Sequence, residues 1–349
     1  KFSCDKSVLQ RAAASAARAA AAKSPIPTLE GLLIEAGASV RITGYDLKKA
    51  IYTTIDADIP EPGSVLIGAR LFCEMLRRMP DGIVTVEAEN GTVSVKCGKA
   101  AFNLVGLSAD DYPDLPTVEA ENGVSLPQDL LKKMINECSF AVSTNESRPV
   151  YMGTLFEIAH NELTMVSVDG YRLALRREPY GDDCSFIVPG TALSDLERLC
   201  GDSDERVVLS VGSKHISFTV GNTVILSRRL EGDFLNYKKA IPESFRVTVK
   251  TTRTDLLEVV ERVSLIIDSK NNAPLRLTFR KDAIDFVCTT PLGKAADSCP
   301  CEGDGGDLEI GFNDHYLSDA LKAAPADELN VCLINLAQTD NSGAGFAQN

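Results

Sequence analysis

Residues that could bind a metal or act as a nucleophile are spread thinly along this chain. The histidines His160, His215 and His315 are widely separated, and no second ligand stands at metal spacing from any of them. Of the 10 cysteines, only Cys299 and Cys301 lie close together, and the sequence has no CxxC motif. Zinc sites need clustered ligands. We therefore predict no metal site and no cofactor, and we expect buried free thiols in a reducing compartment.

The signatures of common enzyme classes are also missing from the sequence. It contains no P-loop, no Gly-rich dinucleotide fingerprint and no GxSxG motif. Asp169 and Arg172, in the phrase VSVDGYRLAL, could be read as catalytic residues. They stand within one turn, however, where an acid and a base more simply cap and pin the backbone. The sequence predicts a protein that is not an enzyme.

The balance of charge limits the partners that the chain can bind. With 49 acidic and 36 basic residues its net charge is −13, which argues against a surface that grips nucleic acid indiscriminately. The predicted helices are nevertheless net +2, while the rest of the chain is −15. Their positive charge gathers in the first two helices, at Lys6, Arg11, Arg18, Lys23, Arg70, Arg77 and Arg78. This is either a cationic binding face or a solvated surface with no partner.

The elements that must position these residues are six short helices separated by strands and turns. The helices are predicted near residues 5–23, 70–79, 128–138, 191–200, 253–262 and 314–324. The first contains RAAASAARAAAA, which has the length of a signal-peptide core, but two arginines interrupt it and it reads better as a helix. No run approaches the roughly 18 apolar residues of a membrane span, so we predict a soluble, cytoplasmic protein with no membrane contact.

The strands alternate clearly between apolar and polar residues. Val93, Val95 and Cys97 would share one face, and the polar residues between them the other. Each half-unit is one helix plus a short meander of strands. This is an α+β design in which helices cover one face of antiparallel sheets.

The whole pattern repeats. The stretch GKAAFNLVGLSADDYPDLP at 98–116 returns in outline as GNTVILSRRLEGDFLNYKKAIP at 221–242, with an acid and an aromatic residue at Asp111-Tyr112 and again at Asp233-Phe234. Residues 60–98 match 182–221, and a third version begins at 308. We predict three copies, at 1–120, 121–243 and 244–349.

Three phrases give the repeat a resemblance to a known family. KFSCDKSVLQRA at the start, DDYPDLP and above all VDGYRLALR resemble the bacterial DNA polymerase III β subunit, the sliding clamp, over residues 1 to about 335. The resemblance implies a head-to-tail homodimer that closes into a ring, with helices lining the inner face and antiparallel sheets outside. Twelve helices at roughly 9 Å spacing make a circle about 35 Å across. Subtracting a helix diameter of about 10 Å leaves roughly 25 Å, which admits duplex DNA.

The resemblance also implies what the ring does. It is a processivity factor that encircles double-stranded DNA without reading sequence, and a non-catalytic accessory subunit of the polymerase. Phosphate contacts from Lys and Arg suffice for this, because they carry no sequence information. The expected DNA-contacting residues are Lys23, Arg11, Arg18, Arg77 and Arg78.

Two protein-binding surfaces follow from the same family. A pocket docks short apolar peptide motifs of DNA polymerase subunits, the clamp loader and repair proteins. Its positions here are Arg148, Tyr151, Val168, Gly170, Tyr171, Arg172, Leu173, Leu235, Lys239 and Ala240. The dimer interface falls on Phe102 and Leu104 on one side and on Leu265 and Ile266 on the other.

The C-terminal residues depart from the repeat. By analogy with the second copy, another alternating strand should follow NVCLIN, but LAQTDNSGAGFAQN is polar and Gly-rich, with little strand character. We expect the chain to be truncated or altered after about Asn335, or to end in a disordered segment. Either outcome puts a wall of the peptide pocket in question.

A rival interpretation is a ring or repeat scaffold that binds proteins and never DNA. Retention on nicked compared with linearised circular DNA separates the two, because only a topological clamp slides off free ends.

Overall fold

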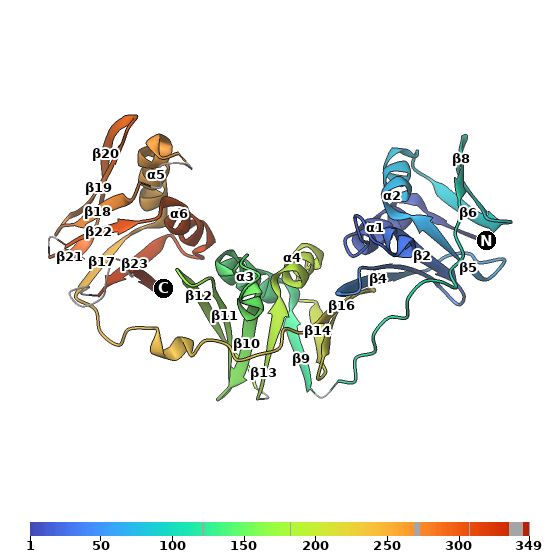
Figure 1. The fold of residues 1–349 in the computed structure, drawn as a ribbon, viewed down its shortest axis with the longest axis horizontal. Helices are drawn as coiled ribbons and strands as arrows, with labels where there is room; N and C mark the ends of the chain where they lie inside the picture. Colours follow the sequence, from blue (N-terminus) through green and yellow to red (C-terminus); the bar gives the residue numbers. More distant parts are fainter. Residues whose placement is uncertain (121, 182, 269–272, 307, 335–344, 349) are drawn as a thin grey trace. The chain divides into compact units, whose positions relative to one another are not determined.

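The structure is a computed structural model that describes residues 1–349 except 121, 182, 269–272, 307, 335–344 and 349. Two compact units can be distinguished. The first comprises Lys1–Ile135, Thr144–Met165 and Arg177–Gly232, and the second Asn136–Ser143, Val166–Arg176 and Asp233–Asn349. Figure 1 traces the chain through both. None of the described helices is long and apolar enough to span a membrane.

All six predicted helices are present, two in each copy. They are α1 (Lys6–Ala17), α2 (Ala69–Arg78), α3 (Gln128–Cys138), α4 (Gly190–Leu199), α5 (Arg253–Val263) and α6 (Asp314–Ala323). Short 3₁₀ turns are η1 (Pro27–Glu30), η2 (Ser139–Ala141), η3 (Pro149–Met152), η4 (Tyr237–Lys239) and η5 (Ser264–Ile266). The predicted α+β class of three tandem copies is confirmed.

Helix α1 is shorter than the predicted segment 5–23. Asp5 caps its start, because the carboxylate accepts the N–H of Ser7 at 2.8 Å. The helix ends at Ala17, although the next four residues include three more alanines. Four residues after Ala17, the N–H of Ala21 already donates to the carbonyl oxygen of Leu29 at 2.8 Å instead of to a helical partner. Tertiary and local backbone constraints thus outweigh the helix propensity of alanine.

The first unit holds one complete small sheet and one large sheet. The small sheet has the order β1 (Phe2–Asp5), β6 (Ile83–Glu89), β7 (Thr92–Cys97) and β8 (Ala100–Val105). The large sheet has eight strands in the order β5 (Gly63–Gly68), β2 (Gly31–Ala36), β3 (Val40–Tyr45), β4 (Lys49–Ile55), β16 (Thr223–Arg228), β15 (His215–Val220), β14 (Arg206–Val211) and β9 (Asn122–Pro127). Strand β10 (Gly153–Ala159) pairs antiparallel with β13 (Cys184–Pro189). Neighbouring strands such as β1 and β6, β2 and β3, and β15 and β16 also pair antiparallel, as predicted.

The large sheet joins the first copy to the second. Its centre is the antiparallel pair β4 and β16, in which Thr53 lies opposite Thr223. Their hydroxyl groups are 2.9 Å apart and buried, so each satisfies the other. Two sheets from different copies thereby become one, and no edge of either is left open at this point.

The core of the first copy lies between its helices and its two sheets. Phe72 and Leu76 of α2 and Leu9 of α1 are fully buried there, among residues of β2, β3, β6 and β7. Helix α1 lies so close to β3 that a Cβ on Gly44 would stand 2.0 Å from the carbonyl oxygen of Ala16. Only glycine allows this approach of two backbones.

We expect Gly44→Ala to destabilise the first copy, because the added methyl group would force α1 away from β3. Overpacking of this kind costs about 1 to 3 kcal/mol, and urea unfolding measures it. Gly37→Ala is the matched control, since nothing lies within 4 Å of a Cβ there. Equal stabilities of the two variants would contradict the close approach.

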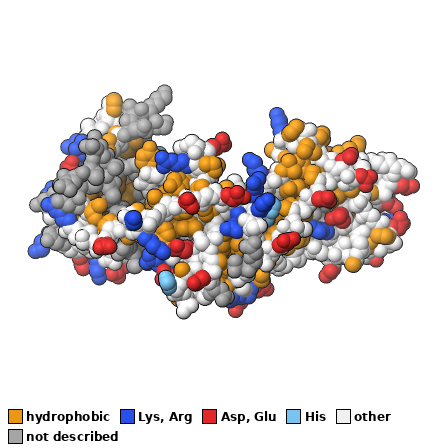
Figure 2. All heavy atoms as spheres, turned by 60° about the horizontal axis from the view of Figure 1, so that its bottom comes forward, with side chains coloured by type: hydrophobic (Ala, Val, Ile, Leu, Met, Phe, Trp, Pro, Cys, Tyr) orange, Lys and Arg blue, Asp and Glu red, His pale blue; other side chains and the backbone are white. Residues whose placement is uncertain are grey.

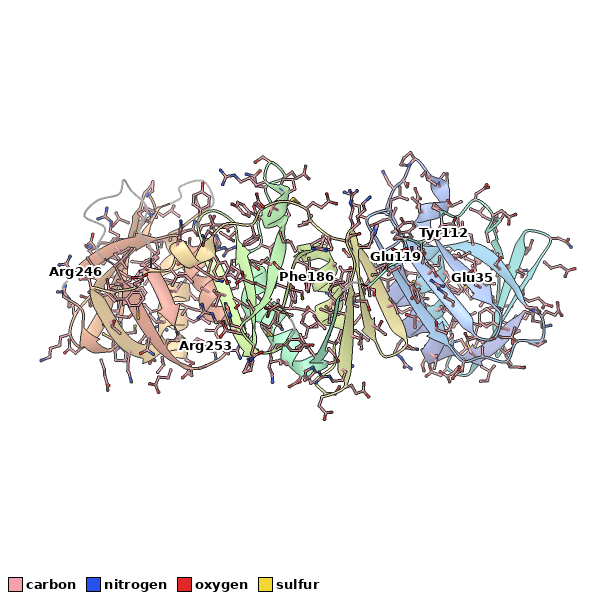
Figure 3. All side chains as sticks on the ribbon, turned by 90° about the horizontal axis from the view of Figure 1, so that it is seen from below. Glu35, Tyr112, Glu119, Phe186, Arg246 and Arg253 are labelled. Carbon is pink, nitrogen blue, oxygen red and sulfur yellow. The ribbon has the colours of Figure 1, made fainter. Side chains whose placement is uncertain are left out.

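The segments that connect the copies are anchored by aromatic side chains. Tyr112, from DDYPDLP, is only 8% exposed and packs in a cluster that includes Leu29, Tyr45 and Leu66 (Figure 3). In the second connection the buried aromatic residue is Tyr237, at 3% exposure, rather than the predicted counterpart Phe234. Both of the similar segments that indicated the repeat therefore contain a buried tyrosine. In the second segment it stands three residues after the position that corresponds to Tyr112.

The third copy is built in the same way. One sheet has the order β20 (Gly293–Pro300), β19 (Ala283–Thr290), β18 (Leu275–Phe279) and β22 (Leu308–Phe312). The other has the order β21 (Glu302–Asp304), β17 (Val247–Thr252), β23 (Glu328–Leu333) and β24 (Gly345–Gln348). Helices α5 and α6 pack together, and the buried core includes Val260, Phe279 and Phe286.

The C-terminal prediction needs one correction. Residues 345–348 form strand β24, which pairs antiparallel with β23, so the expected lack of strand character is wrong for these four residues. A ladder is made by backbone N–H and C=O groups, which a polar sequence also carries. The rest of the atypical tail, 335–344 and 349, lies outside the described residues.

Candidate nucleic-acid, peptide and subunit interfaces

Two of the predicted DNA-contacting residues lie in the last turn of α2. The side chains of Arg77 and Arg78 are 65% and 74% exposed, and both bind the carboxylate of Glu74, at 2.9 and 2.7 Å. Hydrogen bonds from Arg78 and Arg77 lower the pKa of Glu74, so it stays ionised. Two guanidinium groups share one carboxylate, and the helix end keeps a net positive charge.

The cations of α1 and its following loop differ in exposure. Arg11 and Lys23 are exposed to solvent, Arg11 on α1 and Lys23 beyond its end. Lys6 belongs to the same predicted cluster, yet it is 9% exposed and its ammonium group lies 3.1 Å from Asp81. Helices α1 and α2 pack against each other. On the face shown in Figure 2, acidic side chains are scattered among basic ones rather than gathered in one patch.

Arg18 is in a different environment from the other four predicted cations. It caps the end of α1, and its guanidinium group lies 3.7 Å from Asp195 of α4. The side chain of Asp195 is 7% exposed and also binds the ammonium group of Lys49, at the start of β4. Part of the charge of Arg18 is therefore neutralised within the protein.

The phrase VDGYRLALR forms a pinned turn between β11 (Glu162–Val168) and β12 (Leu173–Pro179). Asp169 accepts the backbone N–H groups of Tyr171 and Arg172, at 2.9 and 3.1 Å, and its second oxygen accepts Nε of Arg172. Gly170 takes φ of +98°, which favours glycine. Asp169 and Arg172 thus cap and pin one turn, as their spacing indicates.

Arg172 also binds a residue that the sequence did not single out. Its Nη1 donates to Asp319 of α6 at 2.7 Å, and its guanidinium group lies over the rings of Tyr316 and Phe140, at 4.4 and 5.4 Å. Partial burial lowers the pKa of Arg172, but its hydrogen bonds to Asp319 and Asp169 outweigh this and raise the pKa above its ordinary value. Arg172 is permanently charged, and its charge is used inside the protein.

Beside this turn is an aromatic pair. The side chain of Tyr171 is 83% exposed, and its ring centre lies 6.1 Å from that of Tyr316, with the rings tilted by 31°. Such an offset pair offers an apolar surface that an extended peptide can cover. Tyr316 was not among the predicted pocket residues. Tyr316 is half-buried in α6, and no local pattern in the sequence places it beside Tyr171.

The other predicted pocket residues are distributed over both units. In the second unit Leu173 is half-buried, Val168 is 4% exposed, and the linker residues Leu235, Lys239 and Ala240 are exposed. Val168 can therefore only support such a site from beneath. In the first unit Arg148 is exposed and its guanidinium group lies 5.9 Å from the ring of Tyr151.

Two of the four predicted dimer residues lie on an open sheet edge, and the other two lie in a short 3₁₀ turn. Strand β8 is the last strand of its sheet, and Phe102 on it is 42% exposed, Leu104 half-buried and Val105 78% exposed. In the second unit Leu265, in η5, is 82% exposed and Ile266 is half-buried. Large apolar side chains on an open sheet edge are a ready surface for another chain.

The cysteines are free thiols, as expected. Burial raises the pKa of Cys4 and Cys73 to about 11 and of Cys138 and Cys299 to about 12. Thiols with such values are protonated at neutral pH and are poor nucleophiles and metal ligands. Within the part of the chain that the structure describes, no group of His, Cys, Asp and Glu could hold a metal ion.

Comparison with known proteins gives a consistent result along the chain. Models of the N-terminal, central and C-terminal domains of the DNA polymerase III β subunit match residues 1–116, 125–236 and 238–339. The β sliding clamp of Bacillus subtilis is 30% identical over 348 residues, which is 95% of this chain and 92% of that protein.

Two solved structures show the same similarity. The crystal structure of the B. subtilis DNA polymerase sliding clamp has a TM-score of 0.92 at 28% identity, over 100% of this chain and 98% of that one. The sliding clamp of Pseudomonas aeruginosa bound to griselimycin has a TM-score of 0.91 at 26% identity, over 100% and 95%.

Proposed function

The chain belongs to the DNA polymerase III β subunit family, the sliding clamps, and on this basis we propose that two copies close head to tail into a ring around duplex DNA. The observation that supports the proposal most directly is the open, apolar edge at β8, at one end of a chain whose first two copies are already joined by sheet pairing. Because an edge strand with exposed apolar side chains favours pairing, a second copy is its natural partner. The ring is a non-catalytic accessory subunit that acts where replication occurs, in the cytoplasm.

The experiment that tests the ring is retention on circular DNA. The protein is loaded onto a nicked circle and passed through a gel-filtration column, before and after the circle is cut once. A clamp stays with the circle and is released from the linear molecule. A scaffold that binds only proteins gives the same elution profile in both cases.

We assign the DNA contacts to exposed cations of the first copy, Lys23, Arg11, Arg77 and Arg78, with a smaller share for Arg18 because Asp195 partly neutralises it. Such contacts hold phosphates by charge alone and exchange readily with counterions, which is what sliding requires. The domain boundaries in this proposal are 1–120, 121–243 and 244–349.

Replacing both Arg77 and Arg78 with Gln should make retention on DNA less sensitive to salt. The slope of log affinity against log salt should fall by about one unit for each phosphate that the variant no longer binds. Arg276→Gln with Arg280→Gln is the matched control, because it removes the same charge around strand β18 of the third copy. Equal slopes for the two double variants would refute the assignment of Arg77 and Arg78.

The second activity that we propose is docking of short apolar peptide tails carried by DNA polymerase subunits, the clamp loader and repair proteins. The aromatic pair of Tyr171 and Tyr316 and the half-buried Leu173 support it in the second unit. Leu235, Lys239 and Ala240 are exposed on the linker of the same unit. Apolar side chains with a few polar groups are the usual lining of such a site.

A further inference from the structure

The second helix of every copy carries a carboxylate at the same place. Helices α2, α4 and α6 are each 10 residues long, and the sixth residue is Glu74, Asp195 and Asp319 respectively. All three helices end alike, since the residue after each is extended and donates its N–H four residues back, to Met75, Leu196 and Ala320. The three carboxylates are therefore equivalent positions of the repeat.

A second equivalent feature is the turn that precedes the last strand of each meander. Asp46 accepts the N–H of Lys48 at 2.9 Å, Asp169 that of Tyr171 at 2.9 Å, and Thr290 that of Leu292 at 3.1 Å. Each acceptor binds the N–H two residues later. The strands that follow these turns are β4, β12 and β20.

A cation that follows each of the first two turns forms an ion pair with the carboxylate of the next copy. Lys49, which follows the first turn, binds Asp195 of the second copy, with side-chain exposures of 14% and 7%. Arg172, at the end of the second turn, binds Asp319 of the third copy at 2.7 Å. Lys49 and Arg172 stand three residues after their turn acceptors, so the two ion pairs are the same contact made twice. We name this contact the junction clamp.

Three copies have only two junctions between them. The carboxylate of the first copy and the turn of the third copy are therefore not used in a junction clamp. Glu74 lies in the first of the three copies, and its carboxylate is bound by Arg77 and Arg78 of its own helix. The turn at Thr290 lies in the third of the three copies. The first cation after it in the sequence is Lys294, which is exposed and has no ion-pair partner in the part of the chain that the structure describes. The acid of the first copy and the base of the third copy are thus the two groups that do not pair with another copy.

We propose that Lys294 of one chain binds Glu74 of a second copy, which makes the third junction clamp at the joint that closes the ring. The inference rests on the head-to-tail dimer proposed above. Gly293 occupies the position of Lys49 and Arg172, and Lys294 stands one residue later, on the opposite face of the strand. Strand β20 is the edge of its sheet, so the long side chain can pass around that edge.

The third clamp should be weaker than the pair of Lys49 and Asp195. Glu74 is 42% exposed and already bound to two arginines, whereas Asp195 is buried. Exposed ion pairs are worth little, while buried charge pairs depend strongly on their partner. Reversing one charge, however, turns attraction into repulsion at both joints of the ring, which makes the effect measurable.

The test is a charge swap in the full-length chain. Lys294→Glu and Glu74→Lys should each raise the Kd of the dimer about tenfold or more, as measured by analytical ultracentrifugation at low salt. The double variant restores an opposite pair at both joints and should return to within about threefold of the parent chain. Lys281→Glu makes the same charge change at the other end of β19 and should leave the Kd unchanged.

Each other outcome overturns the inference. If the parent chain is a dimer but the double variant binds no better than the two single variants, Lys294 and Glu74 do not meet. The same holds if Lys281→Glu weakens the dimer as much as Lys294→Glu. A parent chain that remains a monomer removes the proposed ring and the clamp together, so the two failures are distinguishable.

Discussion

A chain with Leu265→Asp is expected to sediment as a monomer at concentrations where the parent chain is a dimer, and to lose its retention on nicked circular DNA. Leu265 is 82% exposed in the isolated chain, so the substitution should cost the fold little. In the dimer it would place a carboxylate against the apolar side chains of β8, where nothing compensates it. The reduced burial and the unpaired charge should cost about 2 kcal/mol or more at each joint. Two joints raise the dimer Kd by roughly a thousandfold.

The control for this experiment is an equal change on an apolar residue away from the joint. Val208→Asp, on β14 of the large sheet, alters a side chain that is 44% exposed. It should sediment and bind circular DNA like the parent chain. A dimer that survives Leu265→Asp would remove η5 from the joint, and one that dissociates equally in Val208→Asp would make the effect nonspecific.

Much of the fold could be predicted because the same pattern of helices and strands occurs three times in the sequence. A single amphipathic segment such as 191–200 is a weak signal, but three equivalent helices and their meanders support one another. The end of α1 could not be predicted in the same way. The run of alanines favours continuation, and the packing of Ala16 against Gly44 is a contact between residues far apart in the sequence, which no local pattern shows.

The candidate sites also differ in whether a local pattern or a contact between distant residues determines them. Residues such as Arg77 and Leu265 could be proposed from pattern and resemblance, and both are exposed, as a binding residue must be. The burial of Asp195 and the engagement of Arg172 by Asp319 depend on side chains from different copies. Nothing local marks such a pair, so the sequence predicts a pinned turn at Asp169 but not the ion pair that ties this turn to α6.

The engagement of Arg172 changes how the peptide site should work. With its guanidinium group held by Asp169 and Asp319, Arg172 positions the turn and is poorly placed to bind a ligand carboxylate. In the proposed site, the apolar surfaces of Tyr171, Tyr316 and Leu173 would then supply the larger share of binding. An extended apolar tail that buries about 200 to 400 Å² would gain roughly 5 to 10 kcal/mol before ordering costs, so we expect net affinity on the order of micromolar.

Leu173→Asp should therefore abolish binding of a fluorescent peptide that carries the Gln- and Leu-containing tail of a polymerase subunit, as measured by anisotropy. The aspartate removes an apolar side chain from the floor of the site and adds a charge that the peptide would have to desolvate. A loss of more than about 3 kcal/mol takes a micromolar affinity beyond the measurable range. Leu173→Met keeps the volume and the apolar character and should bind within a fewfold of the parent chain.

The same variant separates the peptide site from the ring. Leu173 lies in the second copy, away from β8 and η5 in the sequence, so sedimentation and DNA retention of Leu173→Asp should match those of the parent chain. If they do and the peptide still binds with unchanged affinity, the site is elsewhere. If the parent chain itself binds no peptide, the sequence after Asn335, which departs from the repeat, is the segment to change. It is replaced with an alternating apolar sequence, and the titration is repeated.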